Sequence, residues 1–365
     1  MGDRDKKRAK KGDGDMGGDK KSILITGACG FIASHVCRDL VNKYPNYTVV
    51  NLDVIDKCAT LNNVSDLEGK PNYFFCQGDI CNRDLVSHLM TYHNIDHVLH
   101  FAAQSHVDAS FGNPLIHTQT NVVGTHTLLE CARASERIKL FVHVSTDEVY
   151  GDVFGEGAVE NAILEPTNPY SCSKAGAEFI CKAYMKSYKL PVIITRGNNV
   201  YGPRQYPEKV IPKFILRLLQ GQKACIHGDG AARRSYIHVD DVSKAFDTIL
   251  HKGKAFEIYN IGTKFEVSVR ELATTLIREL GLRPAGKEDE LIDFVEDRNI
   301  NDQRYAVDDT KLKDLGWSTS VEWEKGIRDV IEWYKAMDPD HWHDASSALA
   351  PHPVQANTRV LKPKK

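Results

Sequence analysis

The sequence predicts an α/β protein with a doubly wound parallel sheet, followed by a smaller C-terminal lobe. Two observations lead to this fold. Short strands rich in β-branched and other apolar residues alternate with helical segments up to about residue 200. After that point the alternation weakens, and Pro203, Pro207 and Pro212 interrupt it. We therefore expect one large sheet domain and one less regular lobe.

Each element can be placed from its length and pattern. Buried strands are expected at Ser22–Thr26, Thr48–Leu52, Tyr73–Cys76, His97–Phe101, Leu140–Ser145 and Val192–Thr195. Helices are expected between them at Ile32–Lys43, Leu85–His93, Leu115–Ala134 and Tyr170–Tyr188, and later at Ile211–Leu219, Ser268–Leu280 and Trp323–Met337. The predicted division is a disordered tail (1–21), a sheet domain (22–200), a smaller lobe (201–345) and a loose C-terminal tail (346–365). The first tail holds eight Lys/Arg and five Asp with almost no apolar residue, too few to offset the entropy of ordering.

Composition narrows the class of protein. The 365 residues are 42% hydrophobic, which suits a soluble globular chain with a sizeable core. The 47 basic and 49 acidic residues nearly cancel, which argues against a general nucleic-acid binder. Nine cysteines without C-x-x-C spacing disfavour a metal site or a disulfide framework and favour a reducing, cytoplasmic compartment. We also expect no membrane span and no secretory signal, because the chain lacks the long apolar run and the leader pattern.

A phosphate-binding turn is expected between the first strand and the first helix. Gly27, Gly30 and Ala33 are the small residues of a G-x-x-G-x-x-A pattern that opens a helix, and such a helix N-terminus favours an anion. Asp53 ends the second strand 20 residues after Ala33, where an acidic side chain accepts hydrogen bonds from a ribose. No arginine follows it closely, so NAD is favoured over NADP; the alternative for Asp53 is a plain turn residue. Further cofactor contacts are expected at Phe31, Ile32, Asp79, Ile80, Ala102, Ala103 and Ser145.

A tyrosine and a lysine form the first half of the expected catalytic group. Tyr170 and Lys174 are four residues apart, so they share one face of a helix. A free phenol has a pKa of about 10 and is a poor base. A neighbouring ammonium and the positive nicotinamide would favour its ionised form. The Y-x-x-x-K pattern alone is common, but here it follows a dinucleotide-binding turn.

Two adjacent carboxyls form the second half. Asp147 and Glu148 follow Thr146 at the end of the fifth strand, at the sheet edge where doubly wound folds bind ligands. One interpretation is a solvated turn. The other is an acid–base pair whose environments separate the two pKa values.

With these motifs in place, the chain resembles the extended short-chain dehydrogenase/reductases, and within them the nucleotide-sugar 4,6-dehydratases, over roughly residues 22 to 353. The T-D-E sequence at Thr146–Glu148 is the most discriminating part, because related epimerases and decarboxylases share the Tyr/Lys pair but lack the acid pair. The segments that carry the resemblance are Thr26–Ser34, His100–Asp108, Ser145–Gly151, Tyr170–Lys174, Arg196–Pro203, Pro207–Pro212, Tyr259–Gly262 and Asp297–Tyr305.

The resemblance implies a Rossmann-type fold, tightly bound NAD, no metal and a role for each catalytic residue. Tyr170, its pKa lowered by Lys174, would take the proton from the sugar 4-hydroxyl, which Thr146 holds, as NAD accepts the hydride. Glu148 would then remove the proton on carbon 5, and Asp147 would protonate the departing 6-hydroxyl. The resemblance also implies a nucleotide-sugar substrate, bound by Ser105, His106, Asn199, Glu208, Lys209, Val210, Arg234, Asn260 and Arg298. Arginine suits this task because its planar donors match phosphate oxygens.

The identity of the nucleotide is left open. Gln104 and Asn301 replace the Glu and His usual in bacterial dTDP-glucose enzymes, and the chain looks more like the dehydratase part of plant rhamnose synthases, which use UDP-glucose. Uracil and thymine differ by one methyl, which a hydrophobic contact distinguishes by only ~1–3 kcal/mol. The expected reaction is therefore dehydration of UDP-glucose towards rhamnose or another 6-deoxyhexose, with dTDP-glucose as the alternative substrate.

Three further expectations concern other activities and partners. A nucleotide-sugar epimerase or decarboxylase, or an NAD-binding regulator without activity, is a less favoured reading. The resemblance implies a homodimer paired through the helices near residues 115–134 and 170–188. No reductase or epimerase domain follows in the sequence, so a partner enzyme would complete a path to rhamnose.

Overall fold

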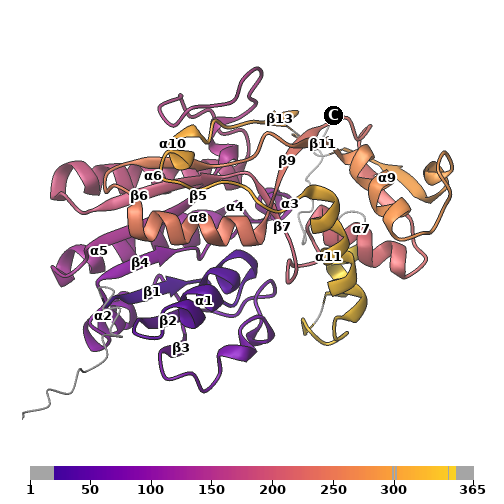
Figure 1. Ribbon diagram of the computed structural model, residues 1–365. Helices are drawn as coiled ribbons and strands as arrows, with labels where there is room; N and C mark the ends of the chain where they lie inside the picture. The colour runs from indigo at the N-terminus through magenta and orange to yellow at the C-terminus, as the bar shows by residue number, and fades with distance from the viewer. Residues whose placement is uncertain (1–19, 298–299, 301, 344, 351–365) are drawn as a thin grey trace, which may run out of the picture.

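The computed structural model describes residues 20–297, 300, 302–343 and 345–350. Most of both expected tails, and the candidate Arg298, lie outside these residues. The described chain forms a large lobe around a parallel sheet and a smaller lobe at one end of it (Figure 1). No helix among the described residues is long and apolar enough to cross a membrane.

The large lobe is built on a seven-stranded parallel sheet with the order β10-β6-β5-β4-β1-β2-β3. The six strands that the sequence predicts are confirmed, and their ends differ by no more than a few residues. The strands are β1 (Ser22–Thr26), β2 (Thr48–Asp53), β3 (Tyr73–Gln77), β4 (His97–His100), β5 (Leu140–Thr146), β6 (Val192–Gly197) and β10 (Ile258–Ile261).

The seventh strand, β10, was not expected from the sequence. It lies well beyond residue 200, yet it pairs in parallel with β6. The helix α8 (Val239–Lys252) was also missed, and it packs on the large lobe beside α1 (Phe31–Lys43). The chain therefore leaves the sheet after β6, begins the small lobe and returns, so a single boundary at residue 200 does not separate the lobes in space.

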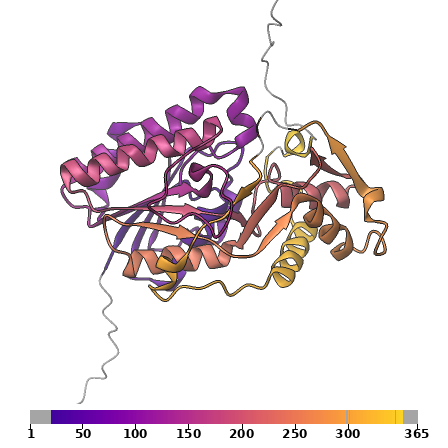
Figure 2. The same ribbon diagram turned by 90° about the horizontal axis from the view of Figure 1, so that it is seen from above.

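Helices cover both faces of the sheet, as Figure 2 shows from above. The alternation of side chains along β1 explains the layering: Ile23 and Ile25 pack in the cluster that includes residues of α1 and α8, whereas Leu24 packs in the cluster on the opposite face. That opposite face is covered by α2 (Arg83–Tyr92), α5 (Thr125–Ser135) and α6 (Pro169–Tyr188).

The helix expected at Leu115–Ala134 is present but not uniform. It consists of α4 (Pro114–His117), a π-helical segment (Thr118–Gly124) and α5 in direct succession. Asn121 in the π-helical segment donates to Gln104 O and to Ser173 Oγ, and its Oδ1 accepts from Gln104 N. The wider turn thus fixes the loop after β4 against α6. Such π-helical turns often occur at functional sites.

The smaller lobe has its own apolar core. The expected helices are confirmed as α7 (Val210–Leu219), α9 (Val269–Glu279) and α11 (Trp323–Ala336), packed with a strand pair of β8 (Ala224–His227) and β12 (Ile292–Val295). A second small sheet contains β7 (Asn199–Tyr201), β9 (Arg233–His238), β11 (Glu266–Ser268) and β13 (Arg304–Tyr305). Two short helices, α3 (Val107–Gly112) and α10 (Thr310–Lys313), complete the lobes.

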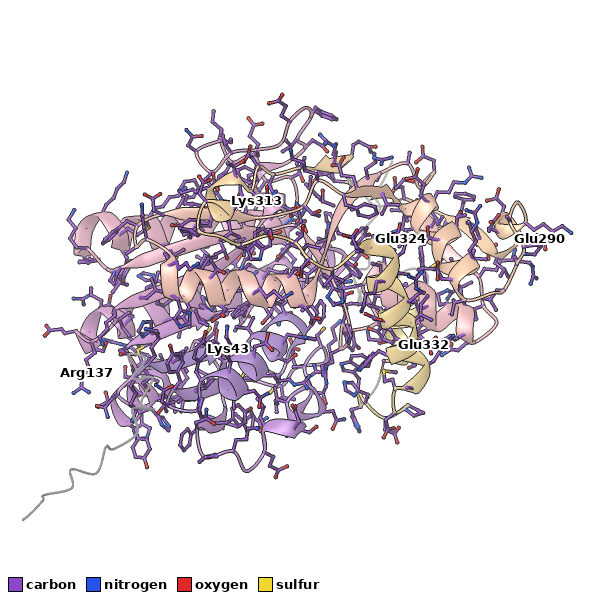
Figure 3. The ribbon with its side chains drawn as sticks, in the orientation of Figure 1. Lys43, Arg137, Glu290, Lys313, Glu324 and Glu332 are labelled. Carbon is purple, nitrogen blue, oxygen red and sulfur yellow. The ribbon has the colours of Figure 1, made fainter. Side chains whose placement is uncertain are left out.

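Charged side chains gather on the outside of both lobes. In Figure 3, Arg137 lies at the outer end of the large lobe and Glu290 at the far end of the small lobe, while Lys43 is exposed and forms an ion pair with Asp247. Acidic and basic groups are mixed on this surface, in keeping with the near-neutral net charge. A polyanionic ligand would therefore depend on a few placed cations rather than on a broad basic surface.

Candidate active site

A cavity of about 690 Å³ opens at the carboxyl ends of the parallel strands. It lies where the strand order reverses between β1 and β4, the position at which doubly wound folds bind ligands. Every residue that the sequence predicts for cofactor binding or for catalysis lines it. A second cavity, of about 170 Å³, shares His106, Glu148, Asn199, Glu208 and Lys209 with the first and extends into the small lobe.

The turn after β1 has the geometry of a phosphate cradle. Gly27 has φ +79°, and a Cβ there would lie 2.8 Å from the backbone N and Cα of Ala102, so only glycine fits. Gly30 is the N-cap of α1 and provides no side-chain cap. The first N–H groups of α1 can therefore bind the negative charge of a pyrophosphate.

Asp53 lies buried at the end of β2, where the sequence predicts a ribose-binding carboxylate. Its Oδ2 accepts from the N–H of Cys29 and its Oδ1 from the N–H of Ile55, both at 2.8 Å. Burial raises the pKa of Asp53, while these backbone donors act in the opposite direction. These two hydrogen bonds hold the carboxylate beside the phosphate turn, and Asp53 lines the cavity.

The loop after Asp53 connects the two lobes, which the sequence did not indicate. Ile55 has φ +54°, an unusual conformation for a β-branched residue, and it directs the following residues across the cavity. Asp56 Oδ2 accepts from Gln104 Nε2 at 3.1 Å, and Lys57 Nζ lies 3.5 Å from Glu208 Oε2. The loop therefore fastens the nucleotide side of the cavity to the small lobe.

The helix α6 positions Tyr170 and Lys174. Asn168 caps it: Asn168 Oδ1 accepts from the N–H of Ser171, and Ser171 Oγ accepts from the N–H of Asn168. Pro169 then supplies the first helical residue, a preferred position for proline. An Asn-Pro pair at the start of a helical pattern is a recognisable signal, so Asn168 could have been identified from the sequence.

Burial shifts the pKa values of both Tyr170 and Lys174. Lys174 Nζ donates to Val144 O, and burial lowers the pKa of Lys174 to about 8. Burial raises the pKa of Tyr170, the carboxylates of Glu148 and Asp147 raise it further, and a hydrogen bond with Thr146 opposes them. With its Nζ on the β5 carbonyl, Lys174 is fixed on the same helix as Tyr170, and the lowering of the Tyr170 pKa by Lys174 and the nicotinamide charge stays a prediction for the complex with NAD.

The acid pair occupies one 3₁₀ turn, Asp147–Tyr150, directly after β5. Asp147 is 3% exposed; Thr146 Oγ1 donates to its Oδ1 at 3.2 Å, and Asn198 Nδ2 donates to its Oδ2 at 2.7 Å. Burial raises the pKa of Asp147 to about 7, and the charge of Glu148 adds to the shift. Glu148 is only partly buried and lines both cavities. The two carboxyls therefore occupy different environments, as acid–base work requires.

Most predicted substrate residues surround the junction of the cavities. His106 and Glu208 are buried and face each other, with Nδ1 3.6 Å from Oε2. Lys209 Nζ donates to the carbonyl of Ser105 at 2.9 Å, and Arg234 lies over the ring of Tyr305 with its Cζ 4.7 Å from the centroid. Two further residues that were predicted to bind substrate, Asn199 and Val210, line the second cavity.

The prediction that Asn260 binds substrate is not supported by its position. Asn260 is fully buried and lines neither cavity. Its Oδ1 accepts from Tyr150 OH, and its Nδ2 donates to the carbonyls of Ala158 and Asp308. Tyr150 OH also accepts from Arg196, so Asn260 belongs to a buried structural network.

Comparison with known proteins agrees with this geometry. Residues 24–330 match the GDP-mannose 4,6 dehydratase family. The chain is 51% identical over 336 residues to the trifunctional UDP-glucose 4,6-dehydratase/3,5-epimerase/reductase RHM1 of Arabidopsis thaliana, covering 91% of this chain and 50% of that protein. It is 48% identical over 341 residues to human dTDP-D-glucose 4,6-dehydratase, covering 93% and 96%. The chain thus spans about half the length of the Arabidopsis protein.

Solved structures show the same fold. The dTDP-glucose 4,6-dehydratase DesIV of Streptomyces venezuelae, crystallised with NAD, superposes with a TM-score of 0.82 at 38% identity, covering 86% of this chain and 97% of that one. UDP-glucose 4-epimerase of Thermotoga maritima superposes at 0.79 with 30% identity, covering 86% and 99%. From the family match and the dehydratase relatives, we conclude that the chain belongs to the GDP-mannose 4,6 dehydratase family, the nucleotide-sugar 4,6-dehydratases.

Proposed function

We propose that the protein converts UDP-glucose to UDP-4-keto-6-deoxyglucose by NAD-dependent dehydration. The observation that carries the proposal is the meeting of Tyr170 and Lys174 with Asp147 and Glu148 at one cavity. An oxidoreductase needs only the first pair. The second pair, with its carboxyls in unlike environments, supplies the acid and the base that loss of water requires.

NAD fits the residues that line the larger cavity. The N-terminus of α1 beside Gly27 and Gly30 would hold the pyrophosphate, and Asp53 the adenosine ribose. When bound, NAD accepts a hydride from carbon 4 of the sugar and returns one to carbon 6, so it is regenerated in each turnover. The loop after Asp53 supports retention of the cofactor, because Lys57 on this loop pairs with Glu208 and so links the nucleotide side of the cavity to the small lobe.

The chain's own residues perform the proton transfers. Tyr170 takes the proton of the 4-hydroxyl, which Thr146 holds, and the 4-ketone then acidifies the proton on carbon 5. Glu148 takes that proton, and Asp147 donates its own to the 6-hydroxyl, so that the bond from carbon 6 to oxygen breaks and water leaves. Glu148 then returns its proton to carbon 5 as the hydride reaches carbon 6. The pKa of Asp147, raised to about 7, suits this donation near neutral pH.

UDP-glucose is the preferred substrate because the relatives at 51% identity act on UDP-glucose, while those at 48% act on dTDP-glucose. The deciding experiment incubates the protein with each nucleotide glucose separately and measures product mass. Loss of one water supports dehydration, and the ratio of kcat/KM values assigns the nucleotide. An unchanged mass with an altered sugar would instead identify a 4-epimerase, the activity of the Thermotoga neighbour.

A variant pair tests the catalytic assignment. Tyr170→Phe removes the proton acceptor without changing the ring, so turnover should be lost while NAD stays bound. The exposed Tyr188→Phe is the matched control and should keep wild-type activity. Full activity of Tyr170→Phe would exclude its assigned role, whereas bound NAD with no activity in any variant or in the wild type would favour a non-catalytic regulator.

The surface of α4, α5 and α6 supports a homodimer. Leu115 is 78% exposed and Phe179 59%, with Val123 on the π-helical segment between them in the chain also exposed. The elements that carry these three residues contact one another, and exposed apolar side chains on neighbouring elements are typical of interfaces. Light scattering should give a dimer mass for the wild type and a monomer mass for Phe179→Asp, with Phe154→Asp as a control at a phenylalanine that is exposed elsewhere on the chain. A monomeric wild type would refute this assembly.

The setting is proposed to be the cytoplasm, where another enzyme reduces or epimerises the 4-keto product. The nine cysteines, all within the described part of the chain, are free thiols, as a reducing compartment would keep them. The Arabidopsis relative is named for epimerase and reductase activities as well as for the dehydratase. Cell fractionation tests the cytoplasmic setting. A coupled assay with a 3,5-epimerase/4-reductase tests whether a second enzyme consumes the 4-keto product.

A further inference from the structure

Asn198 lies in the Arg196–Pro203 segment that carries the resemblance, but the resemblance gives it no role. It follows β6, is 4% exposed and lines the larger cavity. Its Nδ2 donates to Asp147 Oδ2 at 2.7 Å. Among the described residues, the hydroxyl of Thr146 also forms a side-chain hydrogen bond with Asp147, on Oδ1. Asn198 therefore contacts the carboxyl oxygen that Thr146 does not.

The backbone around β10 fixes which way the Asn198 amide faces. Asn198 Oδ1 accepts from the N–H of Thr263 at 3.1 Å, and the N–H of Asn198 donates to Ile261 O at 3.0 Å. Because a backbone N–H can only donate, the oxygen must face Thr263, which leaves the NH₂ group for Asp147. A Cβ at Gly262 would lie 2.8 Å from Asn198 Oδ1, so glycine makes room for this arrangement.

This arrangement leaves one oxygen of Asp147 to carry the proton. An amide N–H donates to Oδ2 and cannot accept, so it opposes protonation on that side. The proton of the neutral carboxyl then resides on Oδ1, because the hydroxyl of Thr146 beside it can rotate and accept, which the amide N–H cannot do. We infer that Asn198 is a positioning residue for the dehydration step: its amide holds Asp147 Oδ2, so that Oδ1 carries the proton delivered to the departing hydroxyl. This inference rests on the proposed function.

Loss of the hydrogen bond between Asn198 and Asp147 should change how the rate of water loss depends on pH. Besides Asn198 and Thr146, the groups that act on Asp147 are the carboxyl of Glu148, the phenol of Tyr170 and the guanidinium of Arg234. The amide of Asn198 favours the ionised carboxyl, so its loss should raise the pKa of Asp147 further. The acid form would then persist to higher pH, and the alkaline limb of the water-loss step would move upward.

The test compares Asn198→Ala and the isosteric Asn198→Asp with wild type, using Asn62→Ala, an exposed side chain far along the chain, as the control. In single turnovers, reduced nicotinamide should form at a near-normal rate in Asn198→Ala. Its decay into dehydrated product should slow by about 100-fold, the effect expected from misplacing a reacting group by about 1 Å. Asn198→Asp should be slower still, because it sets a second carboxylate against Asp147.

A readout without turnover separates positioning from simple damage. An infrared difference titration can follow the protonated carboxyl band that disappears in Asp147→Asn, and in Asn198→Ala its midpoint should move to higher pH. An unchanged midpoint, or water loss at the wild-type rate, would overturn the inference. Failure of the wild type to dehydrate either nucleotide glucose would instead reject the proposed function, and the titration would still test the contact.

Discussion

Asn168 Nδ2 donates to Glu148 Oε2 at 3.3 Å, while Asn168 Oδ1 caps the helix that carries Tyr170. One side chain thus links the expected base on the turn after β5 to the expected proton acceptor on α6. The distance between the two catalytic groups is set by this bridge as well as by the sheet. Replacing Asn168 should therefore affect both stability and chemistry, and the two effects can be separated.

Asn168→Ala should lose the cap, at a cost of about 1 kcal/mol, and also the contact with Glu148. Asn168→Asp keeps the cap acceptor but replaces the donor facing Glu148 with a like charge. We expect thermal unfolding to show a lower Tm for Asn168→Ala than for Asn168→Asp, and single-turnover assays to show slow water loss in both. Normal water loss in Asn168→Asp would mean that the contact does not orient Glu148.

Glu148→Gln should still oxidise carbon 4 but stall before water leaves, because the amide cannot take the proton on carbon 5. Enzyme-bound reduced nicotinamide should accumulate and be visible by its near-ultraviolet absorbance. Glu156→Gln, an exposed position on the following loop, is the control and should turn over normally. Release of 6-deoxy product by Glu148→Gln at the wild-type rate would assign the base elsewhere.

Asp147 should make stability depend on pH. Its pKa is raised by burial from 3.8 to about 7, so the folded state binds the proton more tightly than the unfolded chain does. The contribution of this group to stability is therefore full below pH 3.8 and is lost as the pH rises through about 7. Asp147→Asn cannot ionise, so its Tm relative to wild type should increase across that window while activity is lost. A constant Tm difference would contradict the burial argument.

Substitution of Arg234 and of Asn260 should have different effects on KM and Tm, although the family resemblance assigns both residues to substrate binding. Arg234 lines the second cavity, so Arg234→Ala should raise KM for the nucleotide sugar about tenfold, the effect of losing one charge-assisted hydrogen bond. Asn260→Ala should lower Tm and leave KM unchanged, because its partners are Tyr150, Ala158 and Asp308. A selective rise of KM in Asn260→Ala would restore it as a substrate contact.

The sequence predicts this structure best where one local pattern decides the outcome. The turn at Gly27, the six strands before residue 200 and the T-D-E turn are each contained in a short segment, and all lie where expected. In contrast, β10 lies beyond residue 200, where strands and helices no longer alternate regularly, and it is a strand because it pairs in parallel with β6. The helix α8 does carry a repeating apolar pattern, including Val242 and Phe246, and could have been identified.

Site residues that act through distant contacts could not be found in this way. Asn198 contacts Asp147 only because β6 and β5 are neighbours, and Asn260 is buried only because β10 joins the same sheet. From the sequence alone, an asparagine that contacts a catalytic carboxyl or is buried in the fold cannot be distinguished from an asparagine on the surface. The pKa shifts have the same origin, since burial by the assembled fold is their first cause for Asp147, Tyr170 and Lys174.

The late return of β10 to the sheet bears on how the chain is made. During synthesis β6 emerges first and stays an unpaired, apolar edge until residues 258–261 have left the ribosome. Exposed edges of this kind pair readily with other chains. Nascent protein halted between these points should therefore depend on chaperones, and the sheet that holds the dinucleotide should mature only after much of the small lobe has been translated.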